Sequence, residues 1–210
     1  MTIYKRLDKS AYYKAVPTSP PINMNAFIHL NNSAAQLSSR RFGLLLCVLA
    51  VSFLSACQRY EDIAQCADVL VEGDTGYFEA SEDGMAVDTV TGMRWYRCNA
   101  GERFADGQCL GVPVELVLAD ALAYAQEFSD ASGRKWRLPT QDEMDTLRVD
   151  NCVNPSVNRN VFPSITVNNY WTSTPSKRNS ALGCTTYTYN GNDFCGERKD
   201  VQRPFLLVLD

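Results

Sequence analysis

Six cysteines downstream of position 60 have the spacing that most directly suggests chemistry. They are Cys66, Cys98, Cys109, Cys152, Cys184 and Cys195. Six thiols can pair in fifteen ways, and the two short spacings favour Cys98–Cys109 and Cys184–Cys195, which leaves Cys66–Cys152. Because no CxxC pair occurs, the sequence disfavours a zinc site, an iron–sulfur cluster and a redox-active pair. We therefore expect three structural disulfides formed in an oxidising compartment, with no metal and no cofactor.

The first 56 residues have the pattern of an export signal. Arg40 and Arg41 precede an uncharged apolar run over residues 42–56, which is shorter than the about 20 residues that cross a bilayer. The run ends in Leu54-Ser55-Ala56-Cys57, a string similar to the lipobox of bacterial lipoproteins. We expect cleavage before Cys57 and acylation of its thiol and new amine, which would anchor the protein stably in a membrane. A plain secretory signal and a twin-arginine signal are the alternatives.

The expected organisation has three parts. Residues 1–56 are the leader, residues 57–65 are a lipidated tether, and residues 66–210 form the domain. The leader is long for a signal peptide, so either Met1 or Met24 is the true start. Position 58 is Gln rather than the Asp that usually retains such lipoproteins at the inner membrane. This convention of the sorting pathway favours the outer membrane of a bacterial cell envelope.

Removal of the leader would change the chemistry that the chain can perform. It leaves 14 basic and 23 acidic residues, a net charge of −9, and an acidic protein repels nucleic-acid phosphates. His29 is the single histidine of the sequence and would be lost. That loss excludes Ser-His-Asp and Cys-His catalysis and histidine-ligated metals. Two carboxylates acting on a glycosidic bond are the enzymatic alternative that survives.

The elements that must position the cysteines form an α+β pattern in a single disulfide-stapled domain. Apolar residues on one face predict a helix over 114–129, and Thr140 with Glu143 forms a capping-box pattern that predicts a second helix ending near Asp150. Short strands, expected to pair antiparallel, are predicted over residues 77–80, 86–90, 93–98, 170–174, 185–189 and 205–209. Residues 99–111 are predicted to be a disulfide-closed loop and residues 151–169 an Asn-rich loop. Asn190-Gly191 predicts a hairpin turn, with a calcium site in residues 190–193 as the alternative.

Three motifs occur in a specific order along the chain. The first contains Asp88 and Thr91-Gly92-Met93-Arg94-Trp95. The second is Trp136-Arg137-Leu138-Pro139-Thr140 with Glu143, and the third is Tyr170-Trp171-Thr172-Ser173-Thr174. Together they resemble the Lcl C-terminal domain family, named for a bacterial collagen-like adhesin and long catalogued as a domain of unknown function. The resemblance runs from about Cys66 to Leu209.

The resemblance implies a C-type-lectin-like fold and an envelope location. The adhesin of this family binds a sulfated polysaccharide, so the resemblance also implies such a ligand. It does not imply an enzymatic activity. A sulfated polymer requires a basic surface, so the acidic charge of the processed chain argues against that ligand here.

The motif residues are interpreted mainly as structural. Aromatic side chains of this kind are usually core, although Trp95, Trp136 and Trp171 could instead form a sugar-stacking platform. Arg137 is expected to satisfy buried carbonyls or a carboxylate. The same structural role is expected for Pro139, Thr140, Glu143 and Tyr170.

A polar and aromatic patch is the candidate ligand site. Its members are the loop amides Asn158, Asn168 and Asn169 and the strand tyrosines Tyr187 and Tyr189. Loops held by a rigid scaffold commonly carry binding functions, and a solvated loop held by Cys152 is the alternative.

The sequence therefore predicts a non-enzymatic envelope lipoprotein whose domain binds a glycan or a protein. A structural lipoprotein that acts through protein–protein contacts is the first alternative, and a carboxylate-pair hydrolase is the second. The expected partners are the membrane, through the lipid, and an envelope glycan or protein, but not nucleic acid. The sequence does not fix the oligomeric state.

Overall fold

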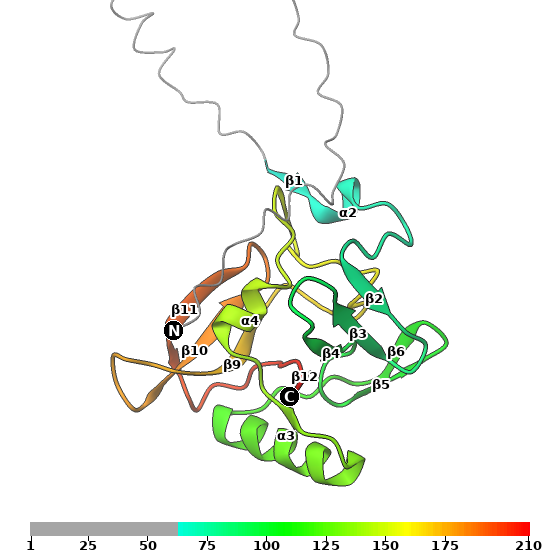
Figure 1. The fold of residues 1–210 in the computed structure, drawn as a ribbon. Helices are drawn as coiled ribbons and strands as arrows, with labels where there is room; N and C mark the ends of the chain where they lie inside the picture. Colours follow the sequence, from blue (N-terminus) through cyan, green and yellow to red (C-terminus); the bar gives the residue numbers. More distant parts are fainter. Residues whose placement is uncertain (1–62) are drawn as a thin grey trace, which may run out of the picture. The chain divides into compact units, whose positions relative to one another are not determined.

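The computed structural model of the protein describes residues 63–210 (Figure 1). The expected leader, its apolar run and the predicted lipidation site Cys57 lie outside the described residues. The last expected tether residues, Ala64 and Gln65, are described, and they form strand β1. Within residues 63–210 no helix has the length and apolar character that a membrane crossing requires.

The architecture is a mixed α/β arrangement with several small, mostly antiparallel sheets. The helices are α2 (Cys66–Val69), α3 (Leu118–Ser132) and α4 (Gln141–Asp145). The strands are β1 (Ala64–Gln65), β2 (Phe78–Ala80), β3 (Met85–Asp88), β4 (Arg94–Tyr96), β5 (Glu102–Ala105), β6 (Gln108–Gly111), β7 (Trp136–Arg137), β8 (Cys152–Val153), β9 (Asn169–Pro175), β10 (Leu182–Tyr187), β11 (Asn192–Arg198) and β12 (Val208–Leu209). The predicted α+β class is thus confirmed in its coarse form.

Four sheets share these strands. The largest has the order β2-β3-β4-β12-β7, and a second has the order β11-β10-β9. β5 pairs with β6, and β1 pairs with β8 in the parallel direction. The helix α3, at the bottom of the view in Figure 1, packs against β7 and β9.

Two large apolar clusters build the core, and each contains at least one motif tryptophan. Trp95 lies in the first cluster with Phe162, Tyr170 and Leu206. Trp136 and Trp171 lie in the second, together with apolar residues of α3 and of the segment that leads into β12. The three tryptophans are therefore core residues, and none of them forms an exposed platform.

Three disulfides brace the fold in the pairing that the spacing suggested. They are Cys66–Cys152, Cys98–Cys109 and Cys184–Cys195. The first ties α2 to β8, and the third joins β10 to β11 beside a register shift. The expected disulfide framework is confirmed.

Several predicted boundaries are wrong, and the observed hydrogen bonds explain them. The expected loop 99–111 contains the hairpin β5–β6, turned by Asp106 and Gly107, which both have positive φ. The first helix begins at Leu118 rather than at 114. The backbone of Leu116, just before it, instead forms an isolated bridge with Arg203.

The second helix and the last strand are also shorter than predicted. α4 ends at Asp145, and only Val208–Leu209 of the expected strand 205–209 belongs to a sheet. The helix count of two was wrong as well, because α2 is a single turn of four residues without an apolar repeat that a sequence pattern can detect.

Candidate functional site

Two exposed tyrosines lie side by side where strand β10 ends. The ring centroids of Tyr187 and Tyr189 are 5.9 Å apart and the ring planes differ by 21°. The side chains are 37% and 36% exposed. Both residues belong to the ligand patch predicted from the sequence, and the structure brings them together.

Phe194 extends this aromatic surface on the neighbouring strand. It lies opposite Thr185, two residues before Tyr187, and residues two apart on a strand project from the same face. Phe194 is 45% exposed. Val167, also exposed, precedes Asn168, whose carbonyl accepts from the Thr188 amide between the tyrosines. We call Val167, Tyr187, Tyr189 and Phe194 the tyrosine face.

A polar network borders the tyrosine face. The Asn168 side-chain amide donates to Glu115 Oε1 at 3.3 Å, and its oxygen accepts from the Asn169 backbone at 2.8 Å. Arg203 donates to the same Asn168 oxygen at 3.4 Å and to Glu197 Oε2 at 3.0 Å. Asn168 and Asn169 therefore lie beside the tyrosines, as the sequence predicted.

The strands beneath this surface are rigidly cross-linked. Cys184–Cys195 joins β10 to β11, and Thr186 Oγ1 donates to Asp193 Oδ1 at 2.8 Å. Burial raises the pKa of the Asp193 carboxyl, while the Thr186 bond opposes that rise. Thr188 Oγ1 donates to the carbonyl of Thr166 at 2.6 Å and so ties the tyrosine segment to the preceding loop.

Asn158 does not belong to this surface. It is buried, its amide donates to the Asp74 carbonyl at 2.8 Å, and its oxygen accepts from the Asn160 backbone at 2.9 Å. These bonds engage both ends of the side chain within the fold. The structure therefore gives Asn158 a structural position and separates it from the other four predicted patch residues.

The central motif forms a network around the start of α4. Glu143 accepts from both terminal nitrogens of Arg137 at 2.8 Å and from the Thr140 backbone at 2.8 Å. Thr140 in turn accepts from the Glu143 backbone, which completes the capping box. The carbonyl of Pro139 accepts from the Ser173 backbone at 2.8 Å and so links the second motif to the third.

The third motif is anchored by buried aromatic residues. Trp171 Nε1 donates to the Leu116 carbonyl at 2.8 Å. The Tyr170 hydroxyl accepts from the Thr166 backbone at 3.1 Å, and burial raises the pKa of this hydroxyl. Both side chains are fully buried, so they support the strand below the tyrosine face rather than touch a ligand.

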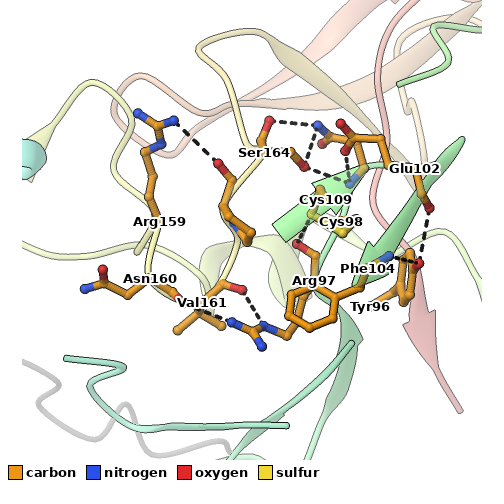
Figure 2. The surroundings of a disulfide bond; sticks show 12 residues. Tyr96, Arg97, Cys98, Glu102, Phe104, Cys109, Arg159, Asn160, Val161 and Ser164 are labelled. Carbon is orange, nitrogen blue, oxygen red and sulfur yellow. Dashed lines mark hydrogen bonds between the residues drawn. A yellow bond between two sulfur atoms is a disulfide. The ribbon is translucent and has the colours of Figure 1, made fainter. Parts of the chain in front are cut away.

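Figure 2 shows a second polar cluster around the Cys98–Cys109 disulfide. Arg97 donates to the carbonyls of Ser81, Asn160 and Val161 at 2.9–3.1 Å, and its guanidinium lies 4.3 Å from the centre of the Phe104 ring. Glu102 lies close to both sulfur atoms, but thiols joined in a disulfide supply no thiolate ligand for a metal. This cluster is structural.

Sequence analysis missed two members of the tyrosine face, Val167 and Phe194, and Phe194 contributes the aromatic ring. Its strand carries charged and small residues at neighbouring positions, so the apolar alternation that predicts strands is absent. The Asn190-Gly191 turn signal could have revealed it, because a hairpin turn implies a second strand immediately after it.

Comparison with known proteins gives one match. The family model of the Lcl C-terminal domain matches residues 84–208. No curated protein and no solved structure matches the chain.

Proposed function

The chain belongs to the Lcl C-terminal domain family, and we propose that it is a non-enzymatic, lipid-anchored domain of the bacterial envelope that binds a glycan through the tyrosine face. The observation that carries this proposal is the pair of nearly parallel, exposed rings of Tyr187 and Tyr189. We also propose that the domain has the C-type-lectin-like fold that the family resemblance implies.

Exposed aromatic rings next to amide groups suit a sugar. The C–H groups on one face of a pyranose pack against an aromatic ring, while the hydroxyl groups at its edge need hydrogen-bond partners. Asn168 and Asn169 lie next to the rings, and Arg203 and Glu197 lie further along the border. The surface therefore offers both kinds of contact that a sugar requires.

Rigidity of the scaffold supports a binding role. Tyr187 lies on β10, which has hydrogen-bonded strands on both sides and a disulfide to β11. A surface that is already ordered loses little conformational entropy when it binds. The proposal thus requires no rearrangement of the fold.

The charge of Asp83 favours binding over hydrolysis in the pocket that this residue lines. A glycoside hydrolase needs a carboxylic acid that stays protonated near neutral pH. Asp83 lines a surface pocket, but the hydrogen bond from Ser81 lowers the pKa of its carboxyl. Asp210, in the same pocket, accepts from Arg137. Asp83, with its lowered pKa, is not suited to donate a proton.

The disulfides support a location outside the cytoplasm. Three disulfides in 148 described residues are typical of an oxidising compartment. The proposed anchor is the acylated Cys57, and Gln58 after it favours the outer membrane. Mass spectrometry of the native protein tests this part. The expected result is an acylated N-terminus at Cys57, whereas an unmodified chain that carries His29 would contradict it.

A protein ligand is the second candidate. Strand β11 is an edge of its sheet, and an exposed Phe194 on an edge strand suits a protein partner. Crosslinking in intact cells, with and without the Phe194→Ala substitution, separates this candidate from the glycan proposal.

The glycan proposal is tested on an array. The oxidised full-length protein, purified in detergent, is applied to envelope and extracellular glycans. We expect binding to a subset of glycans and its loss in the variant Tyr187→Ala/Tyr189→Ala. The control Leu122→Ala removes an exposed apolar side chain from α3 and should bind as the wild type does. Absence of binding across the array, or equal binding by both variants, would refute the proposal.

A further inference from the structure

A pocket that the tyrosine face does not use lies on the five-stranded sheet. Its volume is about 410 Å³. It is lined by Asp83, Met85, Val87, Arg94, Arg134, Lys135, Leu209 and Asp210. Pairing in the sheet places Val87 opposite Arg94 and Arg94 opposite Leu209, so these three side chains project from one face of neighbouring strands.

The two carboxylates of the pocket already have partners. Asp83 accepts from the Ser81 hydroxyl and from the Met85 backbone, and the Ser81 bond lowers the pKa of Asp83. The Asp210 carboxylate accepts from Arg137 Nε. Both carboxylates therefore already accept hydrogen bonds from donors of the protein.

The three cations are far less committed. Within residues 63–210, the side chains of Arg134 and Lys135 form neither a hydrogen bond nor an ion pair with one another or with any other residue. Arg94 donates through Nη2 to the main-chain oxygen of Asp210, the last residue of the sequence, at 3.2 Å. The pocket thus presents positive groups whose hydrogen-bonding capacity is largely unused.

The backbone that carries these cations is ordered. α3 ends at Ser132 and is followed by Gly133 in a left-handed conformation, and the Arg134 carbonyl accepts from Ser129 Oγ at 2.7 Å. The Lys135 carbonyl accepts from the Asp210 backbone at 3.0 Å. The connection from α3 to β7 is therefore fixed against the end of β12, and the two cationic residues have defined positions beside the sheet.

We propose that this pocket binds the carboxylate of a small organic acid with an apolar body. The cations Arg94, Arg134 and Lys135 would hold the carboxylate, because guanidinium and ammonium groups are the strongest donors to it. The apolar body would lie on Met85, Val87 and Leu209, which form the part of the lining without charge.

The carboxylates in the lining disfavour ligands that carry several negative charges. Asp83 and Asp210 line the same pocket as the three cations. A phosphate dianion or a densely sulfated polymer would place excess negative charge beside Asp83 and Asp210, and like charges at short range repel. The site is therefore expected to prefer a carboxylate to a more highly charged anion.

The test uses ligand-observed NMR with the oxidised full-length protein in detergent. The probes are N-acetyl-leucine, which resembles a peptide terminus, and hexanoate, which is a simple aliphatic acid. N-acetyl-leucinamide is the neutral control, and inorganic phosphate and acetate are the competitors. We expect at least one of the two acids to bind. N-acetyl-leucinamide should bind at least about tenfold more weakly than N-acetyl-leucine, because one ion pair of 1.4 kcal/mol supplies that ratio.

Matched variants locate the site. Arg134→Gln/Lys135→Gln should weaken binding of the acid about tenfold, since it removes two of the three cations. Lys177→Gln/Arg178→Gln removes the same two charges from an exposed loop elsewhere and should leave binding unchanged. The proposal is overturned if neither acid binds, if the amide binds as tightly as the acid, if both variants lose binding equally, or if phosphate displaces the acid at lower concentration than acetate does. None of these outcomes depends on the glycan proposal.

Discussion

Arg137 and Glu143 form a two-pronged ion pair between strand β7 and helix α4. Both terminal nitrogens of the guanidinium donate to the carboxylate, each at 2.8 Å. Glu143 also caps α4 through the Thr140 backbone, and Arg137 reaches Asp210 beyond β12. Two residues of the central motif thus connect a strand, a helix and the segment that follows the last strand, which explains this motif without a ligand.

Glu143→Gln should lower the free energy of unfolding by about 1 kcal/mol at pH 7. Gln preserves the capping geometry and removes the charge, and a partly exposed charged pair contributes about that amount. Burial opposes ionisation of Glu143, but the bonds from Arg137 and Thr140 dominate and lower its pKa below the ordinary 4.5. A depressed pKa stabilises the fold above the unfolded value. The stability is therefore lost as the pH falls from about 4.5 through the lowered pKa.

Urea unfolding at pH 7 and at pH 3 measures this difference. The gap between wild type and Glu143→Gln should narrow at the lower pH. Asp142→Asn, an exposed carboxylate one position away on the same helix, serves as the control and should show a much smaller change. A gap that stays constant with pH would show that the ion pair does not stabilise the fold.

Arg97→Leu should destabilise the domain by about 2–4 kcal/mol, because it leaves three carbonyls without their donor. The carbonyls belong to Ser81, Asn160 and Val161, and the arginine is buried. Burial lowers the pKa of the Arg97 guanidinium, which is the sign of a charge removed from water. Arg103→Leu changes an exposed arginine of β5 and should cost little. Similar thermal midpoints for the two variants would contradict this assignment.

Gly183→Ala should destabilise the fold more than Gly196→Ala. A methyl group at Gly183 would lie 2.8 Å from the Trp171 ring and 2.9 Å from Leu118, both buried, and overpacking of this kind costs about 1–3 kcal/mol. At Gly196 the obstacle is the exposed ring of Phe194, at 2.7 Å, which can swing into solvent. Chemical denaturation of both variants checks the order. The reverse order would indicate that the Trp171 contact is not tight.

Removal of the Cys66–Cys152 disulfide should cost more than removal of Cys98–Cys109. Sequence separations of 86 and 11 correspond to about 4.5 and 3 kcal/mol in the chain-entropy description. Cys66→Ser/Cys152→Ser should also increase hydrogen exchange at the Leu70 amide, which donates to the Cys66 carbonyl. Exchange that remains slow there would mean that α2 is held by its packing alone.

Local signals in the sequence predicted the elements that depend on local chemistry. Thr140 and Glu143 predicted the capping box, because this feature is decided within one turn of helix. The start of α3 depends on a bond between distant residues, Leu116 and Arg203. No local pattern contains that information, so the predicted start was four residues early.

In the candidate site, too, contacts between distant residues were not predicted. Tyr187 ends β10 and Tyr189 lies in the turn that follows, so the predicted strand over 185–189 was too long. The two rings nevertheless stack on each other. Asn158 was grouped with the tyrosines by composition, but it donates to the carbonyl of Asp74, a residue 84 positions earlier in the chain. Phe194 joined the site only through the register of β10 with β11, which the sequence does not contain.

The most direct test of the account is to find where a bound glycan contacts the protein. NMR spectra of a glycan selected on the array are recorded with wild type and with Tyr187→Ala/Tyr189→Ala. The account predicts upfield shifts of sugar ring protons that lie over the tyrosine rings, and the loss of these shifts in the variant. Shifts that persist in the variant, or a sugar without shifts while it is bound, would contradict binding at the tyrosine face.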